Sequence, residues 1–144
     1  MSDIDFMRRA LSLASPGVGL TGDNPSVGCV IVRDGVVIAE ARTADGGRPH
    51  AEEQAVALAD TGGATVYVTL EPCAKRSAGG ASCSEMLIQA GVARVVIAVG
   101  DPHPLVAGAG IERLRAAGVE VEVGILADEG RALNGGFFAK WGAS

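Results

Sequence analysis

Residues of the types that bind zinc occur in three separate segments of this chain, and the fold has to bring those segments together. His50 opens the run His50-Ala51-Glu52, Cys73 follows a proline, and Cys83 comes further along. Zinc takes nitrogen and sulfur ligands, and a catalytic site keeps three protein ligands and an open position for water. We therefore expect these three side chains to meet, with Glu52 beside them and free to move protons.

The pattern around these residues predicts a series of strands. Residues 26–33 and 36–42 are rich in β-branched side chains, and Asp34-Gly35 between them is a strong signal for a two-residue hairpin. Three further strands are predicted, over residues 65–70, 94–99 and 119–123. The last of them alternates strictly between apolar and charged residues, so we expect a half-exposed strand at a sheet edge.

Helices are predicted before and between these strands. Ser2 and Asp3 can cap a first helix, which should end at Pro16-Gly17. Its apolar side is predicted to consist of Ile4, Met7, Leu11 and Ala14. A short helix over 111–117 precedes the last strand, and residues 126–141 suggest a helix broken by glycine.

Two predicted helices begin at the candidate ligands. His50 starts a helix that Gly62-Gly63 should end, and Ser82 can cap another that carries Cys83. Helix N-termini have free N–H groups and partial positive charge, which favour thiolate over thiol. An initial hairpin followed by alternating strands and helices predicts an α/β fold with a mixed sheet and helices on its faces. This topology should gather the three ligands at one end of the sheet.

Composition limits what the chain can do. The 144 residues fit one domain, and a net charge of -5 with a pI near 4.9 argues against nucleic-acid binding. No apolar run approaches the length of a membrane span, and the acidic start is unlike a secretory signal. Three cysteines suit ligand use in a reducing compartment better than a disulfide framework. We expect a cytoplasmic protein.

Each candidate residue also has a simpler interpretation. Taken alone, His50 could be a capping histidine, and Glu52 could complement the helix dipole. Asn24 begins a turn with Pro25, yet it could equally recognise a substrate carbonyl. His103 fits a loop histidine better than a fourth ligand. Cys29, in the middle of an apolar strand, is expected to be a core residue. Three aromatic residues are expected in the core or at an interface: Phe137, Phe138 and Trp141.

The signature of zinc-dependent nucleobase deaminases is H-x-E followed by P-C-x-x-C. This chain has H-x-E and P-C, but nine residues separate its two cysteines where the common form has two. The chain resembles the deaminase domain of the bifunctional riboflavin-biosynthesis deaminase/reductase, within the cytidine deaminase-like superfamily. The resemblance extends from about Met7 to Phe138. The segments that carry it are residues 24–32, 47–52, 67–73, 90–96, 101–108 and 133–137.

The resemblance implies a three-layer α/β/α sandwich with a mixed five-stranded sheet. It implies a Zn²⁺ ion held by His50, Cys73 and Cys83, with Glu52 as the proton shuttle. The reaction would be hydrolytic removal of an exocyclic amine from a pyrimidine carrying a ribose phosphate, in a homodimer or homotetramer. The substrate contacts that we predict on this basis are Asn24, Lys75, Arg76, Asp101 and His103.

The chain departs from the family pattern in four respects. The segment between the two ligand cysteines is one residue longer than usual, and Thr43 replaces a histidine. Both changes fall where the relatives hold ribose and phosphate, so we expect Lys75 and Arg76 to replace the phosphate contacts. Ala109 replaces an arginine, and no reductase domain follows, so residues 1–144 are expected to be a single deaminase domain.

Three hypotheses follow from these observations. The chain could be the riboflavin-pathway pyrimidine deaminase working as a separate protein. It could be a relative repurposed for another aminated heterocycle, such as a free base, a nucleoside or a secondary metabolite. It could also be a non-catalytic module stabilised by zinc, although the presence of Glu52 argues against this third possibility.

Overall fold

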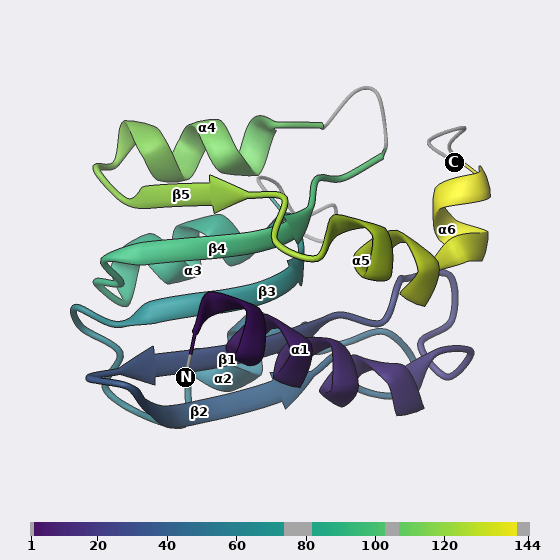
Figure 1. Cartoon of the computed structure of the whole chain (residues 1–144), viewed down its shortest axis with the longest axis horizontal. Helices are drawn as coiled ribbons and strands as arrows, with labels where there is room; N and C mark the ends of the chain where they lie inside the picture. Colours follow the sequence, from purple (N-terminus) through teal and green to yellow (C-terminus); the bar gives the residue numbers. More distant parts are fainter. Residues whose placement is uncertain (1, 74–81, 103–106, 141–144) are drawn as a thin grey trace.

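In a computed structural model of the chain, five strands form one mixed sheet that lies between two layers of helices (Figure 1). The structure describes residues 2–73, 82–102 and 107–140. In spatial order the strands are β2 (Val36–Arg42), β1 (Gly28–Arg33), β3 (Thr65–Leu70), β4 (Arg94–Val99) and β5 (Glu120–Val123). Strand β1 is antiparallel to both of its neighbours, whereas β3, β4 and β5 are parallel. The predicted fold class is confirmed.

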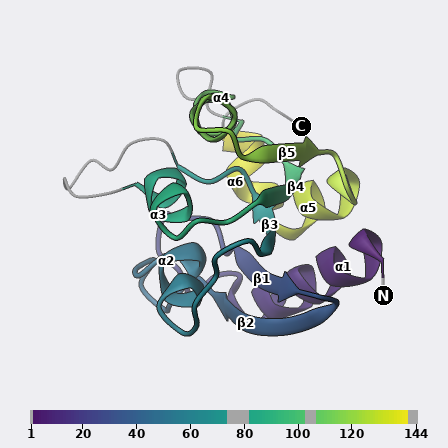
Figure 2. The ribbon, with the colours of Figure 1, turned by 90° about the vertical axis from the view of Figure 1, so that its left-hand side faces the viewer.

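Helices cover both faces of the sheet (Figure 2). One face carries α1 (Asp3–Ala14) and α5 (Ala127–Leu133). The other face carries α2 (Ala51–Val56), α3 (Cys83–Gln89) and α4 (Ala109–Ala116). A 3-10 turn follows α1 at Ser15–Gly17, and α6 (Gly135–Lys140) is the last described element. Each face therefore buries its own hydrophobic cluster against the sheet.

The hairpin forms as its sequence predicts. Asp34 and Gly35 have φ angles of 54° and 77°, the left-handed values that a type I′ turn requires. The turn pairs Arg33 with Val36 and fixes the register of β1 against β2. Strand β5 lies at the edge of the sheet opposite β2, which confirms the edge position expected from its alternating pattern.

The buried side of α1 differs from the predicted one. Ile4 is 48% exposed, whereas Phe6 is 3% exposed and its ring packs against Tyr67 with ring centroids 5.1 Å apart. The helix is rotated relative to the prediction because burying a phenylalanine removes more apolar surface from water than burying an isoleucine. The buried residues are Phe6, Met7, Ala10 and Ala14.

Three predicted boundaries also move. The first strand begins at Gly28 instead of Ser26, because Ser26 bonds to the side chain of Asn134. Helix α2 ends at Val56, well before Gly62, and Leu58 beyond it is 64% exposed, so nothing buried extends the helix. The C-terminal helix breaks at Asn134, not at a glycine, since its φ of -118° and ψ of 48° lie outside the helical region.

The topology defines where a site can lie. Because β3 and β4 are parallel, their carboxyl ends lie side by side at the same end of the sheet. Ligands of open α/β sheets bind just outside these carboxyl ends. Strand β3 leads there into Cys73 and β4 leads into Asp101. In the part of the chain that the structure describes, no helix has both the length and the apolar character needed to cross a membrane.

Candidate metal centre and active site

Three donor atoms converge at the carboxyl end of the sheet. The ring nitrogens of His50 and the sulfur atoms of Cys73 and Cys83 offer ligand atoms that lie within 4.8 Å of one another. His50 Nδ1 is 3.3 Å from Cys83 Sγ. Zinc–nitrogen and zinc–sulfur bonds in a tetrahedral site place neighbouring ligand atoms roughly 3.5–3.8 Å apart. The donor set therefore fits a zinc ion with small adjustments.

The ends of two helices set the positions of these ligands. His50 is the N-cap of α2, and its backbone N–H donates to Glu53 Oε1 at 3.2 Å. Cys83 is the first residue of α3, and its backbone N–H donates to Cys73 Sγ at 3.1 Å. Ser82 caps α3 by accepting from the backbone N–H of Glu85 at 3.2 Å, as its sequence position predicts. Both ligand helices thus begin at the site.

The electrostatic surroundings favour the ionised form of Cys73. Hydrogen bonds from Cys83 and from His50 lower the pKa of the Cys73 thiol to about 4, against the opposing effect of burial. The hydrogen bond between His50 and Cys73 also raises the pKa of the His50 imidazole. Zinc binds the thiolate and the neutral imidazole, so metal binding would release the imidazole proton. The chemistry of the donor set is consistent with zinc.

Glu52 lies in the first turn of α2, beside the donor atoms. Its side chain lines the same cavity as His50 and Cys73 and is only 4% exposed. Burial raises the pKa of the Glu52 carboxyl to about 7, and the nearby Cys73 thiolate adds to this effect. A carboxyl group with a pKa near neutrality can both accept and return a proton at physiological pH.

A cavity of about 190 Å³ opens over these residues. Its lining includes two of the predicted substrate contacts, Asn24 and Asp101. The amide nitrogen of Asn24 donates to the carbonyl of Gly47 at 3.1 Å, which holds the side chain in place. The other three predicted contacts, Lys75, Arg76 and His103, lie outside the described residues.

Phe137 and Glu71 line the cavity, although the sequence did not predict either as a site residue. Phe137 was assigned to the core or an interface, but it is half-buried and forms part of the cavity wall. Thr43, at a position that the sequence resemblance places near the substrate, is buried in the cavity wall and accepts a hydrogen bond from the backbone N–H of Val27 at 2.9 Å. Glu71 also contributes. The one sequence signal for Glu71 was its position directly before Pro72-Cys73. Phe137 had no such signal, because it reaches the cavity from a distant helix.

Two other residues, Cys29 and Phe138, pack in the interior as predicted. Cys29 is buried in β1 within the hydrophobic cluster of one sheet face and is not among the converging donor atoms. Phe138 is 3% exposed and packs with Leu70 and Val99. Both were predicted to be packing residues, and this is confirmed, whereas Trp141 lies outside the described residues.

The fold and the converging donor atoms point to the class of zinc-binding deaminases. Residues 1–99 match the family model described as the cytidine and deoxycytidylate deaminase zinc-binding region, and the chain belongs to this family. Within it, the chain is 50% identical over 140 residues to the riboflavin biosynthesis protein RibD of Actinobacillus pleuropneumoniae, which covers 96% of this chain and 37% of that protein. The chain thus spans well under half the length of the RibD relatives. It is also 40% identical to the diaminohydroxyphosphoribosylamino-pyrimidine deaminase of Buchnera aphidicola, over 97% of this chain and 96% of that protein.

Solved structures agree with this family membership. RibD of Acinetobacter baumannii superposes with a TM-score of 0.92 at 46% identity, over 96% of this chain and 40% of that one. The bifunctional deaminase/reductase of Thermotoga maritima gives a TM-score of 0.89 at 38% identity, over 97% and 41%. The resemblance seen in the sequence is confirmed, including the zinc-binding class of the site.

Proposed function

We propose that this chain removes the exocyclic amine from diaminohydroxyphosphoribosylaminopyrimidine by zinc-dependent hydrolysis. The observation that carries the proposal is the position of Glu52, a buried carboxyl group two residues from His50 in a cavity shared with His50 and Cys73. The substrate is the one named for the Buchnera relative, which this chain matches over nearly its full length.

The metal would be held by His50, Cys73 and Cys83, whose donor atoms already converge. Zinc, when bound, lowers the pKa of a water molecule towards neutrality and so makes a nucleophile available at physiological pH. The remaining steps fall to side chains of this chain. Among the described residues no fourth ligand joins the group, which leaves one coordination position for water.

Glu52 would move two protons in sequence. As the water oxygen bonds to the carbon that bears the amine, Glu52 accepts the water proton and donates it to the adjacent ring nitrogen. It then accepts the remaining hydroxyl proton and donates it to the amine. The carbon–nitrogen bond breaks with its electron pair on nitrogen, ammonia leaves, and a carbonyl group remains. The net change is one water consumed and one ammonia released.

The cavity has the composition that an aminopyrimidine needs. Val27, Leu70 and Phe137 supply apolar surface for the faces of a flat ring. Asn24 and Asp101 carry acceptor oxygens that suit the N–H groups of such a ring. Lys75 and Arg76 would bind the phosphate, and His103 would contact the substrate beside them. These assignments extend the sequence resemblance and are part of the proposal.

We also propose a homodimer or homotetramer in the cytoplasm, with no nucleic-acid partner. None of the three cysteines forms a disulfide, as expected in a reducing compartment. The resemblance to the bifunctional family supports the assembly, which sedimentation of the purified chain would measure.

Ammonia release from a substrate panel tests the proposed reaction. The panel contains the phosphorylated pyrimidine, its dephosphorylated form, cytidine, deoxycytidylate and free aminated bases. We expect the phosphorylated pyrimidine to give the highest kcat/KM. Faster turnover of another compound would favour a repurposed deaminase, and zinc binding without ammonia release from any compound would favour a non-catalytic module.

A further inference from the structure

Glu71 holds together two segments that line the cavity. We propose that it is a positioning residue of the deaminase site, which fixes the backbone of Asp101 and the start of α4 against the strand end that carries Cys73. The inference rests on the proposed function, because positioning matters only if this cavity binds the substrate.

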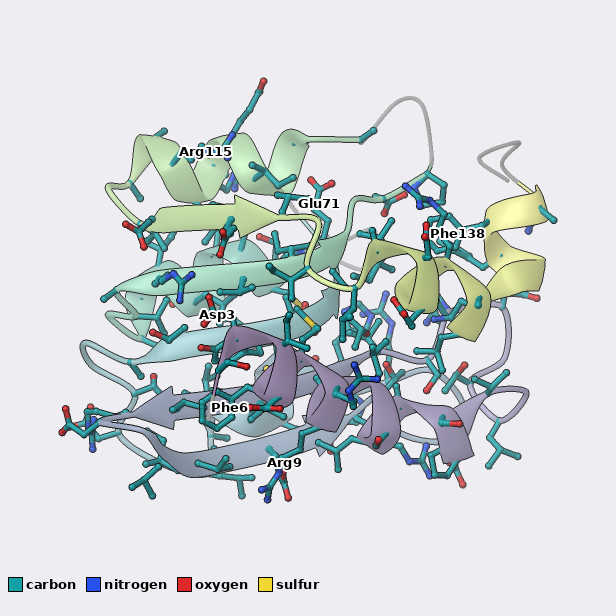
Figure 3. All side chains as sticks on the ribbon, viewed as in Figure 1. Asp3, Phe6, Arg9, Glu71, Arg115 and Phe138 are labelled. Carbon is teal, nitrogen blue, oxygen red and sulfur yellow. The ribbon has the colours of Figure 1, made fainter. Side chains whose placement is uncertain are left out.

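Among the described residues, four backbone N–H groups donate to the side-chain carboxylate of Glu71. Its Oε1 accepts from Asp101 at 3.1 Å and from Gly108 at 3.0 Å. Its Oε2 accepts from Gly110 at 2.9 Å and from Ile111 at 3.3 Å. The side chain is 6% exposed, and Figure 3 shows it extending from the sheet towards the first turn of α4. The carboxylate therefore has its acceptor positions filled by backbone donors.

The first turn of α4 depends on this carboxylate. The first N–H groups of any helix lack partners within the helix, and a side chain at the N-cap usually accepts from them. Gly108 is the N-cap of α4, has a φ of 83° and no side chain to offer. Glu71, distant in sequence, supplies the missing acceptor, and its negative charge suits the positive end of the helix.

The same carboxylate acts on the cavity. Asp101 and Glu71 both line it, and Cys73 follows Glu71 by two residues. Oε1 binds both ends of the segment from Asp101 to Gly108, so one atom sets where that segment leaves β4 and where it enters α4. Movement of Glu71 would shift Asp101 relative to Cys73 without removing a zinc ligand.

Gly110 shows how tightly the two segments meet. A Cβ atom at this position would lie 1.9 Å from the carbonyl oxygen of Pro72 and 3.3 Å from Glu71 Oε2. Only glycine permits α4 to approach the peptide that leads into Cys73 so closely. At Gly100, in contrast, a Cβ would meet nothing nearer than Glu71 Oε1 at 3.5 Å, which is an ordinary contact.

Glu71→Gln tests the assignment. The amide keeps the size of the side chain but presents one acceptor oxygen and places an NH₂ group against backbone N–H donors. Changes to groups that orient a metal site typically cost about 10–100-fold in affinity or activity. We expect a fall of about that size in kcat/KM, carried mainly by KM, with zinc still bound. A lower Tm with kcat and KM unchanged would mean that Glu71 only stabilises α4, and would overturn the proposal.

Gly110→Ala and Gly100→Ala form a matched pair in case the glutamine variant does not fold. The first should reproduce the rise in KM because it separates α4 from Pro72, and the second should behave as wild type. Equal KM values for both alanine variants would also overturn the proposal. If the wild type itself releases no ammonia, the proposed function has failed. Amide hydrogen exchange then tests the hydrogen bonds to Glu71 independently of activity. The amides of Asp101, Gly108, Gly110 and Ile111 should exchange slowly in the wild type and fast in Glu71→Gln.

Discussion

Charged groups lie at both ends of β4, but their exposure and their partners differ between the two ends. At the amino end, Arg94 pairs with three carboxylates near the surface. At the carboxyl end, the carboxyl groups of Glu52 and Glu71 are buried beside the cavity. Neither of these two forms an ion pair with a lysine or arginine among the described residues.

At the amino end, three carboxylates surround one guanidinium group. Arg94 Nη2 is 2.8 Å from Asp3 Oδ2 and 2.7 Å from Glu122 Oε2, while Nε is 3.0 Å from Glu120 Oε2. The hydrogen bond from Arg94 lowers the pKa of Asp3, and Tyr67 O–H also donates to this carboxylate. Each carboxylate here contacts the guanidinium of Arg94, and all four side chains are partly exposed.

The carboxyl end lacks such compensation. Burial raises the pKa of Glu52 to about 7, and among the described residues the partners of the Glu71 carboxylate are backbone N–H groups. Burying a carboxylate is costly unless its surroundings satisfy it. The comparison teaches that the exposure and partners of a charge, not the density of charges, mark the functional end of the sheet.

The largest effect is expected on removal of a zinc ligand. Cys73→Ala should abolish both zinc binding and activity, because two protein ligands do not hold zinc as three do. Cys29→Ala is the matched control: it deletes a buried thiol of the same sheet and should keep zinc and activity at a stability cost of about 1 kcal/mol. Metal analysis and ammonia release measure both. Zinc retained in Cys73→Ala would remove this residue from the ligand set.

Glu52→Gln should separate catalysis from metal binding. An amide cannot shuttle protons, and general acid–base groups contribute about 10²–10⁴-fold, so kcat should fall by at least this factor. The zinc content should stay the same, because Glu52 is not a ligand in the proposed site. Single-turnover ammonia release measures the loss. Wild-type turnover in this variant would contradict the proposed proton shuttle.

Local patterns predicted much of the fold and the ligand set. Three strands have the predicted bounds, 36–42, 65–70 and 94–99, because β-branched runs and their flanking turns are local signals. The convergence of His50, Cys73 and Cys83 was predicted because each lies at a helix start or a strand end.

The remainder depends on contacts that are distant in sequence. Phe137 reaches the cavity from α6, and Glu71 bonds to residues beyond β4, so neither role has a local signature. The predicted orientation of α1 was wrong because the packing of Phe6 on Tyr67, and not periodicity within the helix, decides which side of the helix is buried. Side chains with distant partners were the ones that sequence reasoning missed.

A smaller effect on binding is expected from the cations between the two cysteine ligands. Charge-assisted hydrogen bonds contribute about 1.5–3 kcal/mol each, so Lys75→Ala with Arg76→Ala should raise KM for the phosphorylated pyrimidine at least tenfold. The dephosphorylated compound should be affected little. These residues would give the functional end of the sheet the cations that its buried carboxylates lack. An unchanged KM for the phosphorylated compound would favour a different heterocycle.

At the amino end of β4, a substitution should change stability alone. Exposed ion pairs contribute about 0.2–1 kcal/mol each, and the pairs of Arg94 are half-exposed, so Arg94→Ala should cost about 1 kcal/mol of unfolding free energy. The values of kcat and KM should match those of the wild type, because Arg94 lies at the end of β4 opposite the cavity. Urea unfolding and steady-state kinetics measure the two quantities. A change in KM would mean that the two ends of the sheet are coupled.

The smallest effect concerns the pH dependence of the same cluster. The pKa of Asp3 in the folded chain lies below its ordinary value of 3.8, so its ionised form stabilises the fold above that pH. As the pH falls through the folded-state pKa, Asp3 is protonated in both states and this contribution disappears. The stability difference between wild type and Asp3→Asn should therefore be largest near pH 6 and shrink below pH 3.8. Because acid releases zinc from both proteins alike, urea titrations of the pair isolate the carboxylate. A difference that stays constant across this range would show that Arg94 does not stabilise Asp3 through its charge, and the contrast between the two ends of β4 would then rest on burial alone.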